Sequence, residues 1–241
     1  MGALHGLQNL YNFIGTMQRK CIRRSVEASL KDGAFWALMT GFVEPYIVPF
    51  ALALGASTPA IGFLRSVPAL LGSLVQLINE RLVARLGSCR RAVLADVLTQ
   101  ALAVGAGALS AFLPAPYGLY FFILTVTLYT LSGAMSNPPW AALIGEYIPA
   151  SRRGEFFGFR SQLVGLIFFA ASFAASGILS YYGKGVMTGF VILFALAGVF
   201  RLVSYYYVGQ MYEPRTTFHL PRPFGLRLDP KGRGLPKSAA P

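Results

Sequence analysis

The sequence predicts an all-α membrane protein folded as a bundle of six transmembrane helices, and three observations carry that prediction. Charged residues make up 12% of the 241 residues, against roughly 25% in soluble proteins. The mean hydropathy is +0.55. The apolar residues come in blocks close to the ~20 residues that an α-helix needs to cross the hydrocarbon core of a bilayer. These features exclude a water-soluble globule.

Six apolar blocks have the length of one membrane crossing. Their predicted bounds, by residue number, are 33–54, 60–78, 92–113, 117–148, 156–181 and 186–208. Together they predict a transmembrane domain over residues 31–212. Prolines interrupt two blocks, because Glu44-Pro45 lies midway along the first and Asn137-Pro138-Pro139 lies in the second half of the fourth. Since proline removes a helical hydrogen bond and crowds the preceding turn, we expect both helices to bend or break there.

Polar segments flank this domain on both sides. Residues 1–30 carry apolar side chains at helical spacing followed by basic residues, which predicts an interfacial helix on the cytoplasmic membrane surface. Asn9, Asn12 and Gly15 weaken that helix, so a disordered basic leader remains an alternative. Residues 213–241 are rich in Pro, Gly and Arg, which predicts a disordered cytoplasmic tail or a truncated central loop.

The distribution of basic residues predicts the orientation, because Lys and Arg are retained preferentially on the cytoplasmic side. Of the 21 Lys and Arg residues, all except Arg65, Lys184 and Arg201 fall on one side of the predicted topology. We therefore expect both termini in the cytoplasm. The net charge of +12 is then a signal of topology. It does not indicate nucleic-acid binding, because apolar blocks separate the basic residues.

Four ionisable residues lie inside the predicted spans, where a charge costs roughly 2.5–3.5 kcal/mol at a helix centre. Glu44 lies in the middle of the first span. We interpret it, with slight preference, as a contact for the substrate or a cation; the alternative is a structural pair with Arg65. Asp96 and Arg201 lie near the cytoplasmic face. For these two we favour a mutual structural pair, or snorkelling to the interface, over a place on the substrate route.

The sequence offers no cluster of residues for enzymatic or cofactor chemistry. Its two histidines, His5 and His219, lie near the ends of the chain, and Cys21 and Cys89 have neither disulfide nor zinc spacing. The predicted spans lack the clustered acid, base or nucleophile residues that an intramembrane enzyme needs. We therefore expect no enzymatic activity, no metal and no cofactor.

Two basic stretches resemble signatures of a known family. The stretch ERLVARLGSCRR lies between the second and third predicted spans, and it looks like the loop signature of the major facilitator superfamily. The matching positions are Leu82, Arg85 and Gly87. Ala84 stands where that signature has Asp, which puts the usual gating contact of the Asp in doubt. The stretch NPPWAALIGEYIPASRRGEFFGFR, residues 137–160, resembles a poorly characterised bacterial subgroup of the same superfamily.

The resemblance implies one six-helix half of a transporter, built from two inverted three-helix repeats and working by alternating access. It implies the plasma (inner) membrane, a lipid bilayer around the helices, a small-molecule substrate, and a second six-helix half or a homodimer partner. A coupling ion is left open. The rival interpretation is a non-transporting scaffold, an accessory subunit or an inactive fragment.

Two sets of candidate site residues follow. For the transport pathway we predict Glu44, Pro45, Arg65 and Asn137. For a cytoplasmic gate we predict Arg85, Gly87, Arg90, Arg91, Glu146, Arg153 and Glu155. In the gate, Glu146 and Glu155 are expected to pair with the basic loop between the second and third spans, and to release it as the helices rock.

Overall fold

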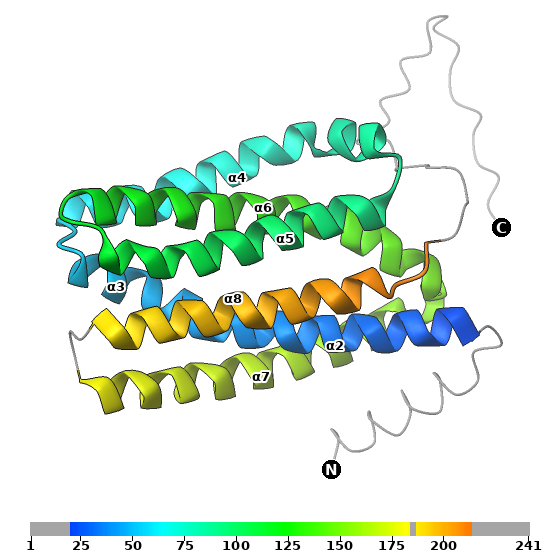
Figure 1. The fold of residues 1–241 in the computed structure, drawn as a ribbon. Coiled ribbons are helices and arrows are strands. Elements are labelled where there is room, and N and C mark those ends of the chain that lie inside the picture. Colours follow the sequence, from blue (N-terminus) through cyan, green and yellow to red (C-terminus); the bar gives the residue numbers. More distant parts are fainter. Residues whose placement is uncertain (1–19, 184–186, 214–241) are drawn as a thin grey trace, which may run out of the picture.

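The computed structural model describes residues 20–183 and 187–213, which form helices joined by short connections (Figure 1). The α-helices are α2 (Lys20–Val43), α3 (Ile47–Ala53), α4 (Thr58–Leu86), α5 (Cys89–Gly107), α6 (Tyr117–Tyr147), α7 (Arg153–Tyr182) and α8 (Met187–Gly209). Short 3-10 segments are η1 (Glu44–Tyr46), η2 (Ala108–Phe112) and η3 (Ala150–Arg152). The described residues contain no strand.

Six helical stretches are long and apolar enough to cross a membrane. The first consists of α2, η1 and α3 in succession, and each of the other five is one α-helix, with or without a 3-10 turn at one end. The predicted all-α, six-helix membrane bundle is confirmed. The helices extend beyond the apolar blocks at several ends; α4, for example, continues past residue 78 to Leu86, because Glu, Arg, Leu and Ala are good helix formers outside the membrane too.

The packing order of the helices repeats between the two halves of the bundle. Helix α2 packs on α7 and α8, as α6 packs on α4 and α5, while α5 and α8 pack on each other at the centre. Figure 1 shows the resulting order α4, α6, α5, α8, α2, α7 across the molecule. The correspondence of α2 with α6, α4 with α7 and α5 with α8 is the arrangement expected of two inverted three-helix repeats.

Aromatic rings fill the core of the bundle where α3, α6 and α8 meet. The ring of Phe50 lies 4.8 Å from that of Phe122, 5.0 Å from that of Phe190 and 5.1 Å from that of Phe194, measured between centroids. Phe50 is fully buried. Ring pairs at such distances attract each other beyond the area they bury. This cluster fixes α3, and with it the end of η1, against the centre of the bundle.

The two predicted helix interruptions differ in the structure. The first helix does change at Glu44-Pro45, where η1 separates α2 from α3. Helix α6, in contrast, is not broken at Pro138 and Pro139 and continues to Tyr147. Helix α2 begins at Lys20 and passes residue 30 without a break. The interfacial leader and the polar tail fall mainly on residues 1–19 and 214–241, outside the described residues.

Candidate functional site

A cavity of about 730 Å³ lies between α2, α5, α6 and α7, in the interior of the predicted membrane region. Its polar lining consists of Thr40, Glu44, Gln100, Tyr129, Thr130, Ser136, Asn137, Arg160 and Ser161. Its apolar wall includes Trp36, Val164 and Phe168. A large cavity with an apolar wall and a few polar groups is the usual form of a small-molecule site.

Glu44 stands at the edge of this cavity on the 3-10 segment η1. Its Oε1 accepts a hydrogen bond of 2.9 Å from the hydroxyl of Tyr129, and its Oε2 lies 3.5 Å from Nη1 of Arg65. Both charged side chains are well exposed, 39% for Glu44 and 53% for Arg65. The pair that the sequence offered as the alternative is therefore present, and the same carboxylate also lines the cavity.

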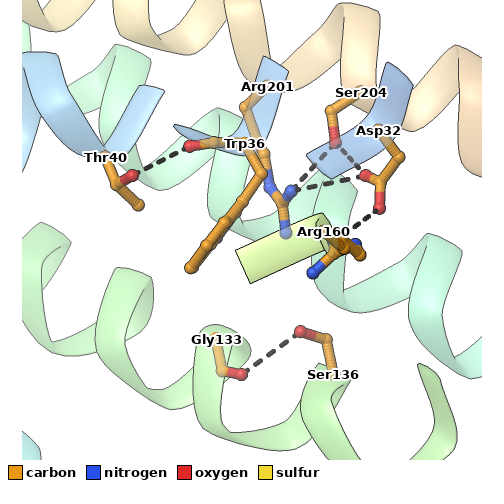
Figure 2. Close-up of polar contacts among 8 residues, drawn as sticks. All are labelled: Asp32, Trp36, Thr40, Gly133, Ser136, Arg160, Arg201 and Ser204. Carbon is orange, nitrogen blue, oxygen red and sulfur yellow. Dashed lines mark hydrogen bonds and ion pairs between the residues drawn. The ribbon is translucent and has the colours of Figure 1, made fainter. Parts of the chain in front are cut away.

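A second charge cluster, which is buried, surrounds Asp32 on α2, the helix that precedes η1. Figure 2 shows Ser204, Arg201 and Arg160 converging on this carboxylate. Ser204 Oγ donates a hydrogen bond of 2.6 Å to Oδ1, and Nη1 of Arg201 lies 3.9 Å from the same oxygen. Nη2 of Arg160 lies 3.8 Å from Oδ2. The cluster joins α2, α7 and α8.

The local sequence makes room for Arg160 in this cluster. Gly33 follows Asp32 directly, and a Cβ atom there would stand only 2.9 Å from Nη2 of Arg160. On its other side, the guanidinium of Arg160 lies 4.1 Å from the ring centroid of Trp140 on α6, a cation–π contact. Arg160 is thus packed between a glycine of α2 and an indole of α6.

A smaller cavity of about 80 Å³ lies between the charge cluster and the main cavity. Asp32, Arg160 and Arg201 line it, together with Trp140. Trp36, Ser136, Asn137 and Arg160 line both cavities. The charged cluster is therefore part of the surface that a molecule in the cavities would meet.

Several buried polar atoms around these cavities have no hydrogen-bond partner. They include the Nε atoms of Arg160 and Arg201, which are donors, and Oε1 of Gln100, which is an acceptor. Nε2 of Gln100 is used, because it donates to the carbonyl of Tyr129 at 3.2 Å. Unpaired buried polar atoms are rare in proteins, and these three belong to residues that line the two cavities.

The partner of Arg201 differs from the one that the sequence suggested. Arg201 pairs with Asp32 and donates a hydrogen bond of 2.9 Å to Ser204, whereas Asp96 is only half-buried and lines neither cavity. Arg201 does not snorkel outward either, because its side chain is 5% exposed. The expected pairing of Arg201 with Asp96 is corrected to a pairing with Asp32.

Sequence reasoning missed Asp32, which lies one residue before the apolar block. One signal could have found it. On α2, Ser25, Ser29, Asp32 and Thr40 are all buried, and with Trp36 they recur at steps of three and four residues. Such steps place them on one helical face. A polar face on an otherwise apolar span indicates contact with other helices or with a cavity.

The predicted gate residues lie at the ends of α4 to α7 that are farthest from η1 along these helices. Gly87 has a left-handed φ of +62° and ends α4, and Ser88 caps α5 by accepting a bond of 3.0 Å from the N–H of Arg91. Nη1 of Arg90 donates to the carbonyl of Met211 at 2.9 Å. The guanidinium of Arg153 donates to the carbonyls of Gly145 and Ile148 near the end of α6.

The expected acid partners of the gate are arranged differently. Glu155 lies 3.9 Å from Arg152, three residues before it, and both are exposed. Within residues 20–183 and 187–213, no ion pair joins Glu146 or Glu155 to Arg85, Arg90 or Arg91. Instead Glu213, after α8, accepts bonds from Ser88 Oγ and from the N–H of Cys89. This carboxylate ties the segment after α8 to the start of α5.

In the described residues, no group of three or more His, Cys, Asp or Glu side chains is placed to hold a metal ion. Comparison with known proteins gave no match among curated proteins and none among solved structures. One family model does match. It is described as Major Facilitator Superfamily, and it covers residues 33–234, which include all of the six membrane-length stretches except residues 20–32 of α2. With this match and the six-helix bundle together, the chain belongs to the major facilitator superfamily.

Proposed function

We propose that this protein, a transporter of the major facilitator type, moves a small molecule across the membrane by alternating access, driven by an ion or solute gradient. The observation that carries the proposal is the cavity of about 730 Å³ with Glu44 at its edge. Glu44 stands where the first membrane helix is interrupted. Discontinuous membrane helices often form the binding region of secondary transporters, and here the first helix is interrupted while its equivalent, α6, is continuous.

In this proposal Glu44, Pro45, Arg65 and Asn137 form the transport pathway. Pro45 has no N–H, so it leaves a carbonyl of the preceding turn without its helical partner beside the Glu44 carboxylate. Asn137 lines both cavities. Arg65 is the counter-charge of Glu44, and their 3.5 Å contact joins α4 to the first helix. A contact of this length between exposed groups is weak enough to break as helices move.

We further propose that a second six-helix body covers the open side of the cavity, either a partner half or a second copy of this chain. The support is the burial of the helices. In α4 and the η3–α7 stretch, only 17% and 11% of the most apolar window is buried within the bundle, against 50% in the first and third stretches. These two helices therefore have the most surface left for contacts outside the bundle.

For the opposite end of the helices we keep the proposal of a gate formed by Arg85, Gly87, Arg90, Arg91, Glu146, Arg153 and Glu155, facing the cytoplasm of the inner membrane. Its support is positional, since the basic residues gather at one end of the bundle. The bonds of Arg90 and Arg153 to backbone carbonyls give this end a fixed framework. In the described residues no ion pair joins Glu146 or Glu155 to the basic loop, so in this proposal such pairs would form in another state of the transport cycle, where an exposed pair contributes only ~0–1 kcal/mol.

The test is uptake by the full chain in proteoliposomes, with a panel of radiolabelled organic acids, amines and sugars and an imposed proton or sodium gradient. We expect at least one solute to accumulate. Glu44→Gln should slow that uptake about tenfold or more, because hydrogen bonds to a charged group are worth about 1.5–3 kcal/mol. Glu80→Gln is the matched control, since Glu80 is exposed on α4 and lines neither cavity.

Two results would count against the proposal, and they differ in meaning. If no solute accumulates under either gradient, the chain acts as a scaffold or accessory subunit, the rival interpretation. If a solute accumulates equally in the Glu44→Gln variant at every pH, transport stands and the assigned pathway is wrong.

A further inference from the structure

We propose that the cavity takes an organic anion, whose carboxylate or phosphate end is held between Arg160 and Arg201. The inference rests on the proposed transport function, because it names the substrate class of the same cavity. It is carried by the hydrogen-bonding state of the two arginines, by their burial, and by the space beside them.

The two guanidinium groups share a single carboxylate that does not satisfy them. Asp32 lies 3.8 Å from Arg160 and 3.9 Å from Arg201, longer than the roughly 3.2 Å limit of ordinary N–H···O hydrogen bonds. The short bond to Asp32 comes instead from Ser204, at 2.6 Å. Arg201 donates to Ser204, and in the described part of the chain Arg160 donates no hydrogen bond at all. Each guanidinium therefore keeps donors in excess.

Some of these donors are buried as well as unpaired. The Nε atoms of both arginines are inaccessible to water and have no acceptor. The side chain of Arg201 is only 5% exposed and that of Arg160 16%. Both arginines line the smaller cavity, Arg201 from α8 and Arg160 from α7. Planar guanidinium groups suit carboxylate and phosphate oxygens, which accept two parallel bonds.

The space beside the arginines fits such a group. The smaller cavity, about 80 Å³, has room for one carboxylate or phosphate, and it adjoins the main cavity, with which it shares Trp36, Ser136 and Asn137 in its lining. The main cavity offers an apolar wall from Trp36, Val164 and Phe168 for the body of the molecule. Gln100 adds an amide side chain to the lining of that cavity.

The acidic groups near the cavities do not cancel this preference. Glu44 is already paired with Arg65, and Asp96 lines neither cavity. Asp32 is shared between two arginines. The charged groups that line the cavities, together with Arg65, thus comprise three cations and two anions. A cationic solute in the smaller cavity would lie against two guanidinium groups, whereas an anion would complete their hydrogen bonds.

The chain carries its own reporter for the test, because its two tryptophans, Trp36 and Trp140, line these cavities. The full chain in lipid nanodiscs is titrated with cyclohexanecarboxylate, cyclohexanecarboxamide and cyclohexylmethylammonium, which share one apolar body and differ in charge. Tryptophan emission is recorded. We expect a saturable change with the carboxylate, at least tenfold weaker affinity for the amide, and no saturation with the ammonium compound. Cyclohexyl phosphate, titrated in parallel, distinguishes the two anion classes.

Arginine variants locate the effect. Arg160→Gln and Arg201→Gln should each weaken the anion at least tenfold, and Arg201→Lys should weaken it less because the charge is kept. Arg81→Gln, at an exposed position of α4, should leave the affinity unchanged. Should Arg201→Gln fail to fold, Arg160→Gln and Arg201→Lys decide the question. Equal affinity for amide and anions, no saturable response to either anion, or unchanged affinity in Arg160→Gln overturns the proposal.

Uptake separates this inference from the proposed function. Binding of the anion without accumulation of labelled cyclohexanecarboxylate or any panel solute in proteoliposomes contradicts transport and leaves the anion site standing. Gradient-driven accumulation of another solute, with no saturable anion binding, contradicts the anion site alone.

Discussion

The two ion clusters of this bundle line neighbouring cavities but differ in their exposure. The pair of Glu44 and Arg65 joins the first helix to α4, and its side chains are 39% and 53% exposed. The cluster around Asp32 joins α2 to α7 and α8, and the side chains of Asp32 and Arg201 are 6% and 5% exposed. The first cluster is open to water or solute; the second is enclosed by helices, and its free space is the smaller cavity.

The difference teaches that depth along a span does not identify which charges a fold depends on. Glu44 is the most central acid of its span, yet its contacts leave it accessible to the cavity. Asp32 lies near the end of the apolar block, yet helices surround it. An exposed pair contributes little to stability and is free for function, whereas a buried charge depends on its partner.

The largest expected effect is that of breaking the enclosed cluster. Arg201→Ala removes the hydrogen-bond donor to Ser204 and one of the two cations facing Asp32. The buried carboxylate of Asp32 then keeps Arg160 as its only nearby cation among the described residues. We expect the free energy of unfolding to fall by about 3–5 kcal/mol. Reversible unfolding in mixed micelles with increasing sodium dodecyl sulfate, followed by tryptophan emission, measures the loss.

The control for this variant removes both charges at once. Asp32→Asn combined with Arg201→Ala should cost less than Arg201→Ala alone, because no unpaired carboxylate remains. A double variant that is less stable than the single one would show that packing of the arginine, and not charge, holds the helices together.

A smaller effect is expected where the cluster is disturbed only by shape. Gly33→Ala places a Cβ atom 2.9 Å from Nη2 of Arg160 and should push the guanidinium away from Asp32. Gly158→Ala is the control, because nothing lies within 4 Å of a Cβ there, and alanine is favoured over glycine in a helix by about 1 kcal/mol. We expect Gly33→Ala to be about 1–3 kcal/mol less stable than the control. Equal stabilities in the same unfolding assay would mean that Arg160 adapts without cost.

The fold of this protein is largely readable from its sequence, because hydrophobic length specifies membrane spans directly. Hydropathy located all six helices, and Pro45 located the interruption at η1. At Pro138 and Pro139 the second of the two expected outcomes, a break, does not occur, because α6 continues through both prolines. Proline removes a hydrogen bond wherever it stands, but whether the helix breaks depends on the neighbours that pack against it, and a local pattern does not contain that information.

The candidate site is only partly readable for the same reason. Glu44 and Arg65 were found as charges in adjacent helices, where a short connection brings them close. Arg201 could face Asp96 or Asp32 equally well by sequence, since α8 packs on both α5 and α2, and only the rotation of α8 decides between them. Asp32 was missed because the predicted apolar block starts at Gly33, one residue after it, whereas the helix extends back to Lys20.

The smallest expected effect tests the exposed cluster. Arg65→Gln removes a contact of 3.5 Å between side chains that are both more than one-third exposed, and Tyr129 still donates its 2.9 Å hydrogen bond to Glu44. We expect the free energy of unfolding to change by about 0–1 kcal/mol, in the same assay that shows the large loss for Arg201→Ala. A loss of about 3 kcal/mol or more would mean that the bilayer, or a covering body, encloses the pair. Glu44 would then be held in place by structure, and its role on the transport pathway would have to pass to Gln100 and Asn137, which line the same cavity.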